Sequence, residues 1–353
     1  MGSVTGKAVC FASLLALAAM SGAGGTGVTN PGKDVSQTRP AAGPRLENIV
    51  QLTTEGDCGE PYFSFDGSRI IFQSKREGRQ YDQIYMMDAD GSNQRLVSTG
   101  RGRATCSYFF PDGRTVLYAS THGRQGEPPA PPQGYGKGGR YDWSFDAAFD
   151  IYVADLSGMV LRKLVESPGY DAEATISPRG DRIVFTSDRD GDLEVYSMAL
   201  DGSDVKRLTF EKGYDGGAFY SPDGTRIIYR GSRTDDYRAL QIYVMNADGS
   251  GKRQLTQGAG TSFAPSWHPD GHSIVFASNM NAPADNRGDF DIYLLDVDAS
   301  PGAPGSTPLK LTDYTGFDGF PVFSPDGRRL VFASNRSGAS VYQTSIFIAD
   351  FKR

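Results

Sequence analysis

A tight turn written around Pro-Asp-Gly recurs six times along this chain of 353 residues. In such a turn Pro presets the first backbone dihedral, Asp bonds its own backbone, and Gly adopts the left-handed conformation at no steric cost. Each turn therefore joins two antiparallel strands in a short hairpin. A spacing of roughly 45 residues is typical of propeller blades and of long helical repeats. The six turns end at Gly67, Gly113, Gly180, Gly224, Gly271 and Gly327.

The residues around each turn predict strands. A run of β-branched and aromatic residues follows every turn, as in Arg182–Phe185, and is too short for a helix. A third predicted strand, such as the one with Val195-Tyr196, comes next, and a Gly-containing turn connects it to a fourth strand. In three of the repeats this fourth strand ends in Leu-Thr. Four strands linked by hairpins form a propeller blade, and no segment has a sustained helical period. Helical repeats are therefore excluded.

The two ends of the chain together supply the four strands of one blade. The sixth repeat ends after its third strand, and a spare fourth strand, Ile49–Thr53, precedes the first turn. Pairing both termini in one sheet satisfies two exposed edges. The prediction is an all-β, six-bladed β-propeller over residues 45–353, with four-stranded antiparallel blades and the N-terminal strand closing the last blade.

The first 23 residues have the pattern of an export signal. Lys7 precedes an apolar stretch from residue 8 to 20, and Ser21-Gly22-Ala23 is a small-residue cleavage site. The stretch is short for a membrane span, although an uncleaved anchor is the alternative. Residues 24–44 are predicted to be a flexible linker. We expect a periplasmic or secreted monomer with no membrane span after signal cleavage.

Charge argues against nucleic acid as a partner. The formal net charge is −6 and becomes −7 when the leader is removed with Lys7, and no Lys/Arg tract stands out. Two cysteines remain in the mature chain, Cys58 and Cys106, near the entries of the innermost strands of adjacent blades. In an exported protein they would either form a disulfide or remain as separate buried thiols.

The repeat resembles the six-bladed propeller of TolB and of TolB-like proteins. The residues that carry the likeness are the Ser-Pro-Asp-Gly turns, the Ile-Tyr strands, the closing Leu-Thr, and the segments Ser74–Arg76, Ser187–Arg189 and Ser334–Arg336. The likeness covers about residues 45–353 and is specific for the fold but weak for the function. It implies a protein-interaction module of the cell envelope, with a Pal-like lipoprotein as a partner. TolB has an α/β domain before its propeller, and the predicted linker here is too short for one.

Acidic residues recur where the innermost strands begin. A partial ring of carboxylates around a narrow channel would favour a hard cation such as calcium, or a basic side chain from a partner. The alternative is that these residues cap turns and bond backbone amides. No other cofactor is predicted. The candidates are Asp57, Glu60, Asp171, Glu173, Asp215 and Asp318.

The second repeat carries a long insertion, residues 122–148. Its first part is rich in Pro and Gly, and Tyr141, Trp143 and Phe145 follow. A loop of this length is usually functional or disordered. Exposed aromatics suit recognition of a protein or carbohydrate. The alternative is that they cover one end of the channel.

Two functions from different classes follow from these features. The favoured one is a non-catalytic interaction module that binds an envelope protein, or peptidoglycan or another glycan. The other is a propeller enzyme of the glycan lyase or lactone hydrolase type, with channel carboxylates as acid and base. The three histidines, His122, His268 and His272, do not predict a metal cluster, and Gly-x-Ser-x-Gly is absent. No catalytic residue is assigned.

Overall fold

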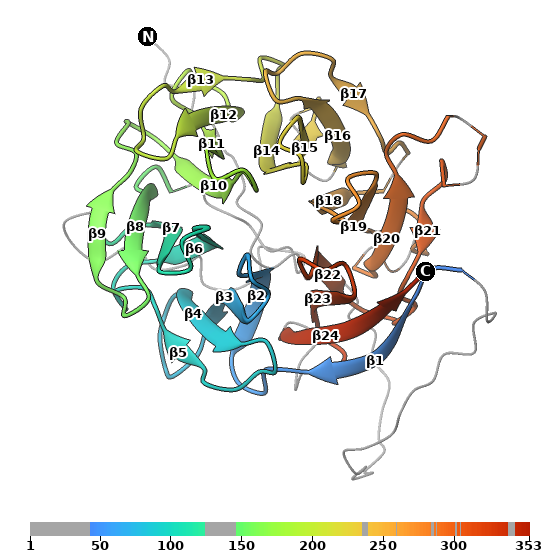
Figure 1. Ribbon diagram of the computed structural model, residues 1–353, viewed down its shortest axis with the longest axis horizontal. Coiled ribbons are helices and arrows are strands. Elements are labelled where there is room, and N and C mark those ends of the chain that lie inside the picture. Colours follow the sequence, from blue (N-terminus) through green and yellow to red (C-terminus); the bar gives the residue numbers. More distant parts are fainter. Residues whose placement is uncertain are drawn as a thin grey trace.

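Six small sheets stand radially around a central axis in the computed structural model (Figure 1). The structure describes residues 43–123, 146–234, 239–258, 260–283, 286, 288–300, 302–303, 305–337 and 343–353. Every sheet has four antiparallel strands, and none of these residues lies in an α-helix. The predicted export signal and residues 24–42 of the predicted linker lie outside the described residues.

The first three blades follow the chain in order from the innermost strand outward. Blade 1 contains β2 (Asp57–Phe63), β3 (Arg69–Lys75), β4 (Gln83–Asp88) and β5 (Arg95–Leu96). Blade 2 contains β6 (Ala104–Phe109), β7 (Thr115–Ser120), β8 (Asp150–Asp155) and β9 (Val160–Lys163). Blade 3 contains β10 (Asp171–Ile176), β11 (Arg182–Ser187), β12 (Glu194–Ala199) and β13 (Lys206–Arg207).

The last three blades repeat this order, with one exchange at the end. Blade 4 contains β14 (Tyr214–Tyr220), β15 (Arg226–Ser232), β16 (Gln241–Asn246) and β17 (Arg253–Gln254). Blade 5 contains β18 (Ser262–Trp267), β19 (Ser273–Ser278), β20 (Asp291–Asp296) and β21 (Leu309–Lys310). Blade 6 contains β22 (Asp318–Phe323), β23 (Arg329–Ser334), β24 (Ser345–Lys352) and, as its outermost strand, β1 (Arg45–Gln51).

The ring is closed by pairing of β1 with β24, as predicted. Arg45 lies opposite Lys352 and Gln51 opposite Phe347 in an antiparallel register. The Leu-Thr that ends the fourth strand has a physical role in this closure. The backbone N–H of Ile346 donates to the Thr53 hydroxyl at 2.8 Å, and Thr209, Thr256 and Thr312 accept the corresponding N–H groups in blades 3, 4 and 5.

The Pro-Asp-Gly turns have the local chemistry expected from their sequence. In blade 4, Asp223 Oδ1 accepts hydrogen bonds from the Ser221 hydroxyl at 2.6 Å and from the Thr225 backbone N–H at 3.0 Å. These bonds, that of Ser221 first, lower the pKa of Asp223 to about 2. Gly224 follows with a φ of +70°, in the left-handed region that favours glycine. The turn therefore stabilises its hairpin without help from neighbouring blades.

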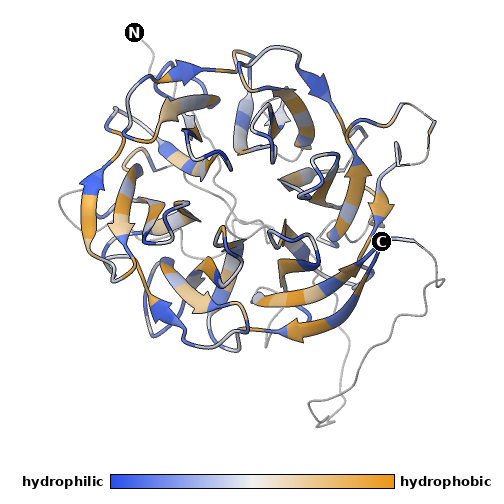
Figure 2. Ribbon diagram, viewed as in Figure 1, coloured by the Kyte–Doolittle hydropathy of each residue, from blue (hydrophilic) through white to orange (hydrophobic). Residues whose placement is uncertain are grey.

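The hydrophobic core lies between neighbouring blades. Val184 and Val195 of blade 3 pack with Ile227 and Tyr229 of blade 4, and all four side chains are fully buried. Burial of a large side chain of this kind contributes roughly 1.5–3 kcal/mol. Figure 2 shows the short outermost strands β5, β13 and β17 in hydrophilic colours. The outermost strands β1, β9 and β21 carry hydrophobic colours as well, so the rim of the ring is polar only in part.

Candidate functional site

A β-bulge at the same place in every innermost strand shapes the centre of the propeller. Each bulge residue lies seven positions before the glycine of the following turn, and each has a positive φ between 49° and 57°. A bulge bends its strand and turns a side chain out of the regular pleat. All six bulge residues line one central cavity, either with a side chain or with the backbone. The bulge residues are Glu60, Cys106, Glu173, Gly217, Ala264 and Phe320.

The cavity at the centre is small. Its volume is about 30 Å³, and all six blades contribute to its lining. This space holds about two water molecules. Ligand sites for small organic molecules are usually about 300–1,000 Å³. The channel therefore has room for a small polar group but not for a sugar ring.

Aromatic side chains narrow the channel on the side of the Pro-Asp-Gly turns. Phe219 of blade 4 reaches across the axis, with ring centroids 5.8 Å from Tyr62 of blade 1 and 6.3 Å from Tyr108 of blade 2. Tyr62 and Tyr108 are 5.5 Å apart, and all three rings are partly exposed. We call these three residues the aromatic mouth. Nearer the opposite end, Phe263, Phe317 and Phe320 pack together and are buried.

Glu173 is the most completely bonded carboxylate of the cavity. Its Oε2 accepts hydrogen bonds from the Tyr214 hydroxyl at 2.7 Å, from Thr186 Oγ1 at 2.7 Å and from the Gly217 backbone N–H at 2.9 Å. Its Oε1 pairs with Arg230, which also donates to the Tyr214 hydroxyl at 3.1 Å. A buried charge is stable when it is paired and hydrogen-bonded in this way. Glu173 therefore links blade 3 to blade 4.

Glu60 differs from Glu173 although it occupies the equivalent bulge in blade 1. The side chain is 4% exposed and forms none of the ion pairs found among the described residues, and its neighbour in the channel is the Cys106 thiol. Burial raises the pKa of Glu60 to about 8, with Arg230 opposing and Glu173 reinforcing the shift. A carboxyl group of this kind stays neutral until a positive charge approaches it. Glu60 is the candidate binding group of the channel.

The structure places three of the four predicted aspartates at equivalent positions away from the cavity lining. Asp171, Asp215 and Asp318 lie two residues before the bulge and are fully buried. Each pairs with an arginine from the loop after the second strand of its own blade. The pairs are Arg189–Asp171 at 2.8 Å, Arg233–Asp215 at 2.6 Å and Arg336–Asp318 at 2.7 Å. These aspartates therefore hold neighbouring segments together and do not form a carboxylate ring with Glu60.

Asp57 lies one position further from its turn than the other aspartates, so its register differs. Its Oδ1 accepts hydrogen bonds from the Thr344 backbone N–H at 3.1 Å and hydroxyl at 2.9 Å, which joins blade 1 to blade 6. Asp82 lines the same small recess. Burial, and then the charge of Asp57, raise the pKa of Asp82 to about 7. This pair of carboxyl groups was not predicted from the sequence.

Cys58 and Cys106 are free and buried in the structure, which matches the alternative of two separate buried thiols. Cys58 occupies the aspartate position of blade 1, where Arg76 Nη2 lies 3.2 Å from its sulfur. Cys106 occupies the bulge position of blade 2 and faces the cavity. The two residues thus lie at different positions of their repeats, and their side chains point to different partners. Counting from the turn glycines, nine residues for Cys58 and seven for Cys106, would have revealed this offset.

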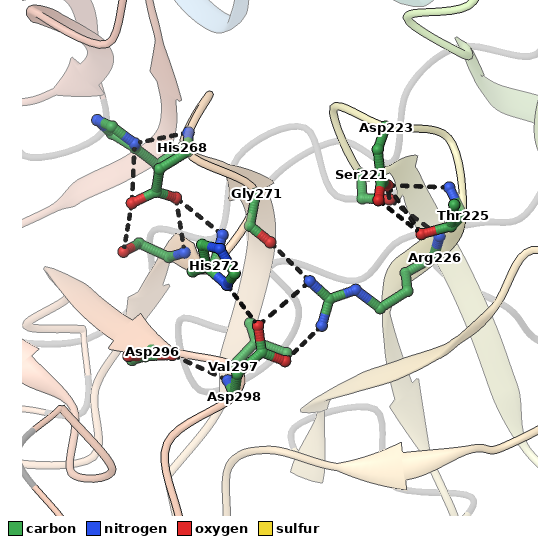
Figure 3. Close-up of polar contacts among 12 residues, drawn as sticks. Ser221, Asp223, Thr225, Arg226, His268, Gly271, His272, Asp296, Val297 and Asp298 are labelled. Atoms are coloured by element: carbon green, nitrogen blue, oxygen red, sulfur yellow. Dashed lines mark hydrogen bonds and ion pairs between the residues drawn. The ribbon is translucent and has the colours of Figure 1, made fainter.

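A second polar cluster joins blades 4 and 5 beside the turns (Figure 3). Arg226 donates to Asp298 Oδ1 at 2.6 Å and to the Gly271 carbonyl at 2.6 Å, and Asp298 lies 2.7 Å from His272 Nδ1. His268 packs edge-on against Phe323 of blade 6, and burial lowers the pKa of His268. His122 follows β7 at the opposite end of the blades. The histidines that the structure describes therefore do not converge on a metal.

The predicted recognition residues of the insertion, Tyr141, Trp143 and Phe145, lie outside the described residues. Sequence reasoning missed the aromatic mouth and Arg230. The signal was available: counting back five residues from each turn glycine reaches Tyr62, Tyr108 and Phe219. Within the described residues, no helix has the length and apolar character of a membrane span.

Comparisons with known proteins agree with the predicted propeller. Residues 142–239 match the TolB beta propeller domain. A TolB homologue of Chlorobium chlorochromatii is 32% identical over 144 residues, which cover 35% of this chain and 32% of that protein. A TolB homologue of Chlorobium luteolum is 29% identical over the same length and is covered to 33%. The chain therefore spans about a third of the length of the curated relatives it matches.

Solved structures extend the likeness to most of the chain. The putative TolB of Agrobacterium tumefaciens superposes with a TM-score of 0.56 at 22% identity, covering 88% of this chain and 99% of that one. An oligogalacturonate lyase in complex with manganese superposes with a TM-score of 0.53 at 16% identity, covering 86% of this chain and 93% of that one. At these identities both likenesses concern the fold alone.

Proposed function

Because the chain folds as a TolB-like six-bladed propeller, we propose that it is a non-catalytic protein-binding module exported to the cell envelope. The partner docks on the aromatic mouth formed by Tyr62, Tyr108 and Phe219. Partly exposed aromatic rings from three blades, gathered over a cavity of about 30 Å³, are the observation that carries this proposal. Aromatic side chains are enriched among the residues that dominate binding energy at protein interfaces.

The channel beneath the mouth favours a basic group on the partner. A lysine ammonium is close in size to a water molecule, so the cavity would accept it. Glu60 is the carboxyl group that would meet it, because Glu173 is already paired with Arg230. An arriving cation would lower the pKa of Glu60 and turn a neutral acid into a buried ion pair. A metal cation in the channel would act on Glu60 in the same way.

The enzyme alternative receives less support. The predicted enzyme mechanism needs two channel carboxyl groups that face a substrate, and the cavity is too small to admit a sugar ring. Glu173 is also held by four donors, so it is not free to exchange a proton. The likeness to an oligogalacturonate lyase adds no catalytic group to this chain.

The test is partner capture from an envelope extract, followed by titration of the purified partner. A Pal-like lipoprotein and peptidoglycan are the first candidates. We expect Phe219→Ala and Glu60→Gln to weaken binding, Phe219→Ala by at least about tenfold. Phe210→Ala is the matched control, because Phe210 is 65% exposed and lies at the opposite end of the blades. A partner that binds both phenylalanine variants with wild-type affinity, or turnover of a glycan or lactone, would contradict the proposal.

A further inference from the structure

Three carboxylates meet at the interface between blades 3 and 4, outside the channel. Glu194 begins β12, Glu211 lies in the connection between the blades, and Asp215 lies in β14. One carboxylate oxygen of each lies within 4.8 Å of the others. Glu194 and Asp215 are fully buried, whereas Glu211 is partly exposed. No other group of three possible metal ligands occurs in the described part of the chain.

Each carboxylate is oriented by a cation of the protein. Arg207 bonds Glu194 Oε1 at 2.7 Å, Arg233 bonds Asp215 Oδ1 at 2.6 Å, and Lys252 lies 3.2 Å from Glu211 Oε1. These pairs use one oxygen of each group. The three cations come from three different segments, so the positions of the carboxylates are fixed from several sides. Partners of this kind, which orient the ligands, are usual around metal sites.

Two of the remaining oxygens have no partner. Glu194 Oε2 and Asp215 Oδ2 are buried and accept no hydrogen bond. An unpartnered buried carboxylate oxygen costs free energy, so its presence needs an explanation. Two buried acceptor atoms without a donor, on carboxylates whose oxygens approach within 4.8 Å of one another, are suited to a cation.

The interface between blades 5 and 6 can be compared with the three-carboxylate cluster. Between blades 5 and 6, Asp291 and Asp318 occupy the same two positions, with Lys310 and Arg336 as their cations. That interface has two carboxylates but no third within reach. A pair of acids with a pair of bases therefore also occurs without a third carboxylate, and one buried oxygen there, Asp318 Oδ1, likewise accepts no hydrogen bond. Glu211 is the addition that turns the contact between blades 3 and 4 into a three-oxygen site.

We propose that Glu194, Glu211 and Asp215 bind one hard divalent cation, of the calcium class, which bridges blades 3 and 4. Calcium takes oxygen ligands at 2.3–2.6 Å and completes its coordination with water. Two ligands on opposite sides of such an ion lie about 5 Å apart, so oxygens within 4.8 Å of one another fit a single ion. The exposed side of Glu211 gives the ion and its water molecules access from solvent.

The test uses the full chain, stripped of metal with a chelator and titrated with terbium and then with calcium. Tyr229 and Tyr243 stack at 5.4 Å, and both sense the charges of Asp215 and Glu211, so they would sensitise terbium emission. We expect one ion per chain, displacement of terbium by calcium, and a rise in Tm of about 2–5 °C at a tenfold excess over Kd. Magnesium should compete less well.

Three variants decide whether the ion is at this site. Glu211→Gln should weaken calcium binding at least about tenfold while the protein stays folded, because Glu211 is partly exposed. Glu194→Gln should do the same while keeping its contact with Arg207. Asp318→Asn is the matched control, since it alters the two-carboxylate interface, and it should leave calcium affinity unchanged. Absence of bound ion at millimolar calcium, or equal affinity in all three variants, would overturn the proposal.

Discussion

Replacing Thr53 by valine tests whether the N-terminal strand closes the ring. Thr53 is fully buried, and its hydroxyl accepts the backbone N–H of Ile346 at 2.8 Å. Valine has nearly the same shape, so no cavity forms, but the Ile346 N–H loses its partner. A buried donor left unpaired costs about 1–3 kcal/mol. The free energy of unfolding should fall by that amount, and Tm by roughly 2–4 °C per kcal/mol.

The matched variant is Thr256→Val, which removes the same bond inside blade 4. Thr256 accepts the Ile242 N–H at 2.9 Å and also donates to Gln241 at 2.7 Å, so its loss should cost at least as much. Only Thr53→Val loosens the contact between the two ends of the chain. Urea unfolding measures the free energy of both variants, and limited proteolysis measures release of the N-terminal strand. Equal proteolysis rates in the two variants, or wild-type stability of Thr53→Val, would refute the closure argument.

Three further predictions follow from single residues. The folded pKa of Glu60 is about 8 against an ordinary 4.5, so the stability it contributes is complete below pH 4.5 and is lost as pH rises through 8. Wild type should therefore lose stability relative to Glu60→Gln between pH 5 and 8, by up to about 1.4 kcal/mol per pH unit, and parallel urea curves would contradict this. Gly213→Ala should destabilise by more than about 2 kcal/mol, because φ is +112° and the new Cβ would lie 2.1 Å from the Ser232 carbonyl oxygen; a melting curve checks it. Alkylation of unfolded, unreduced protein should label both Cys58 and Cys106, whereas mass spectra without label would indicate a bridge.

The fold was predictable because its determinants are local and repeated. A turn such as Ser221–Gly224 forms its hydrogen bonds within a few residues, so the sequence alone indicates the hairpin. The spare strand before the first turn likewise has only one edge to pair with. Both inferences need the order of residues along the chain and the pattern of polar groups, and neither needs the exact packing of side chains.

The site was predictable only in part, because it depends on register. The acidic residues at the strand entries were found, yet Asp171, Asp215 and Asp318 fall two positions before the bulge and pair with arginines. A bulge shifts which side chains face the axis, and its position is invisible in a simple alternating pattern. Phe219 was missed for a related reason: its partners belong to blades 1 and 2, far away in sequence.

The bulge residues connect this register to function. A positive φ costs a residue other than glycine roughly 1–2 kcal/mol, and glycine fills the position only in blade 4, as Gly217. If the bulge served the backbone alone, glycine would suit every blade better than Glu60, Cys106 or Phe320. The chain instead places a carboxyl, a thiol and an aromatic ring at a strained position around the cavity. Strain that a fold tolerates at one ring of residues is characteristic of a binding site. The same argument does not apply to the aspartates of the blade interfaces, which are not among the residues with a positive φ, and it therefore favours the channel over the blade interfaces as the place where the proposed partner binds.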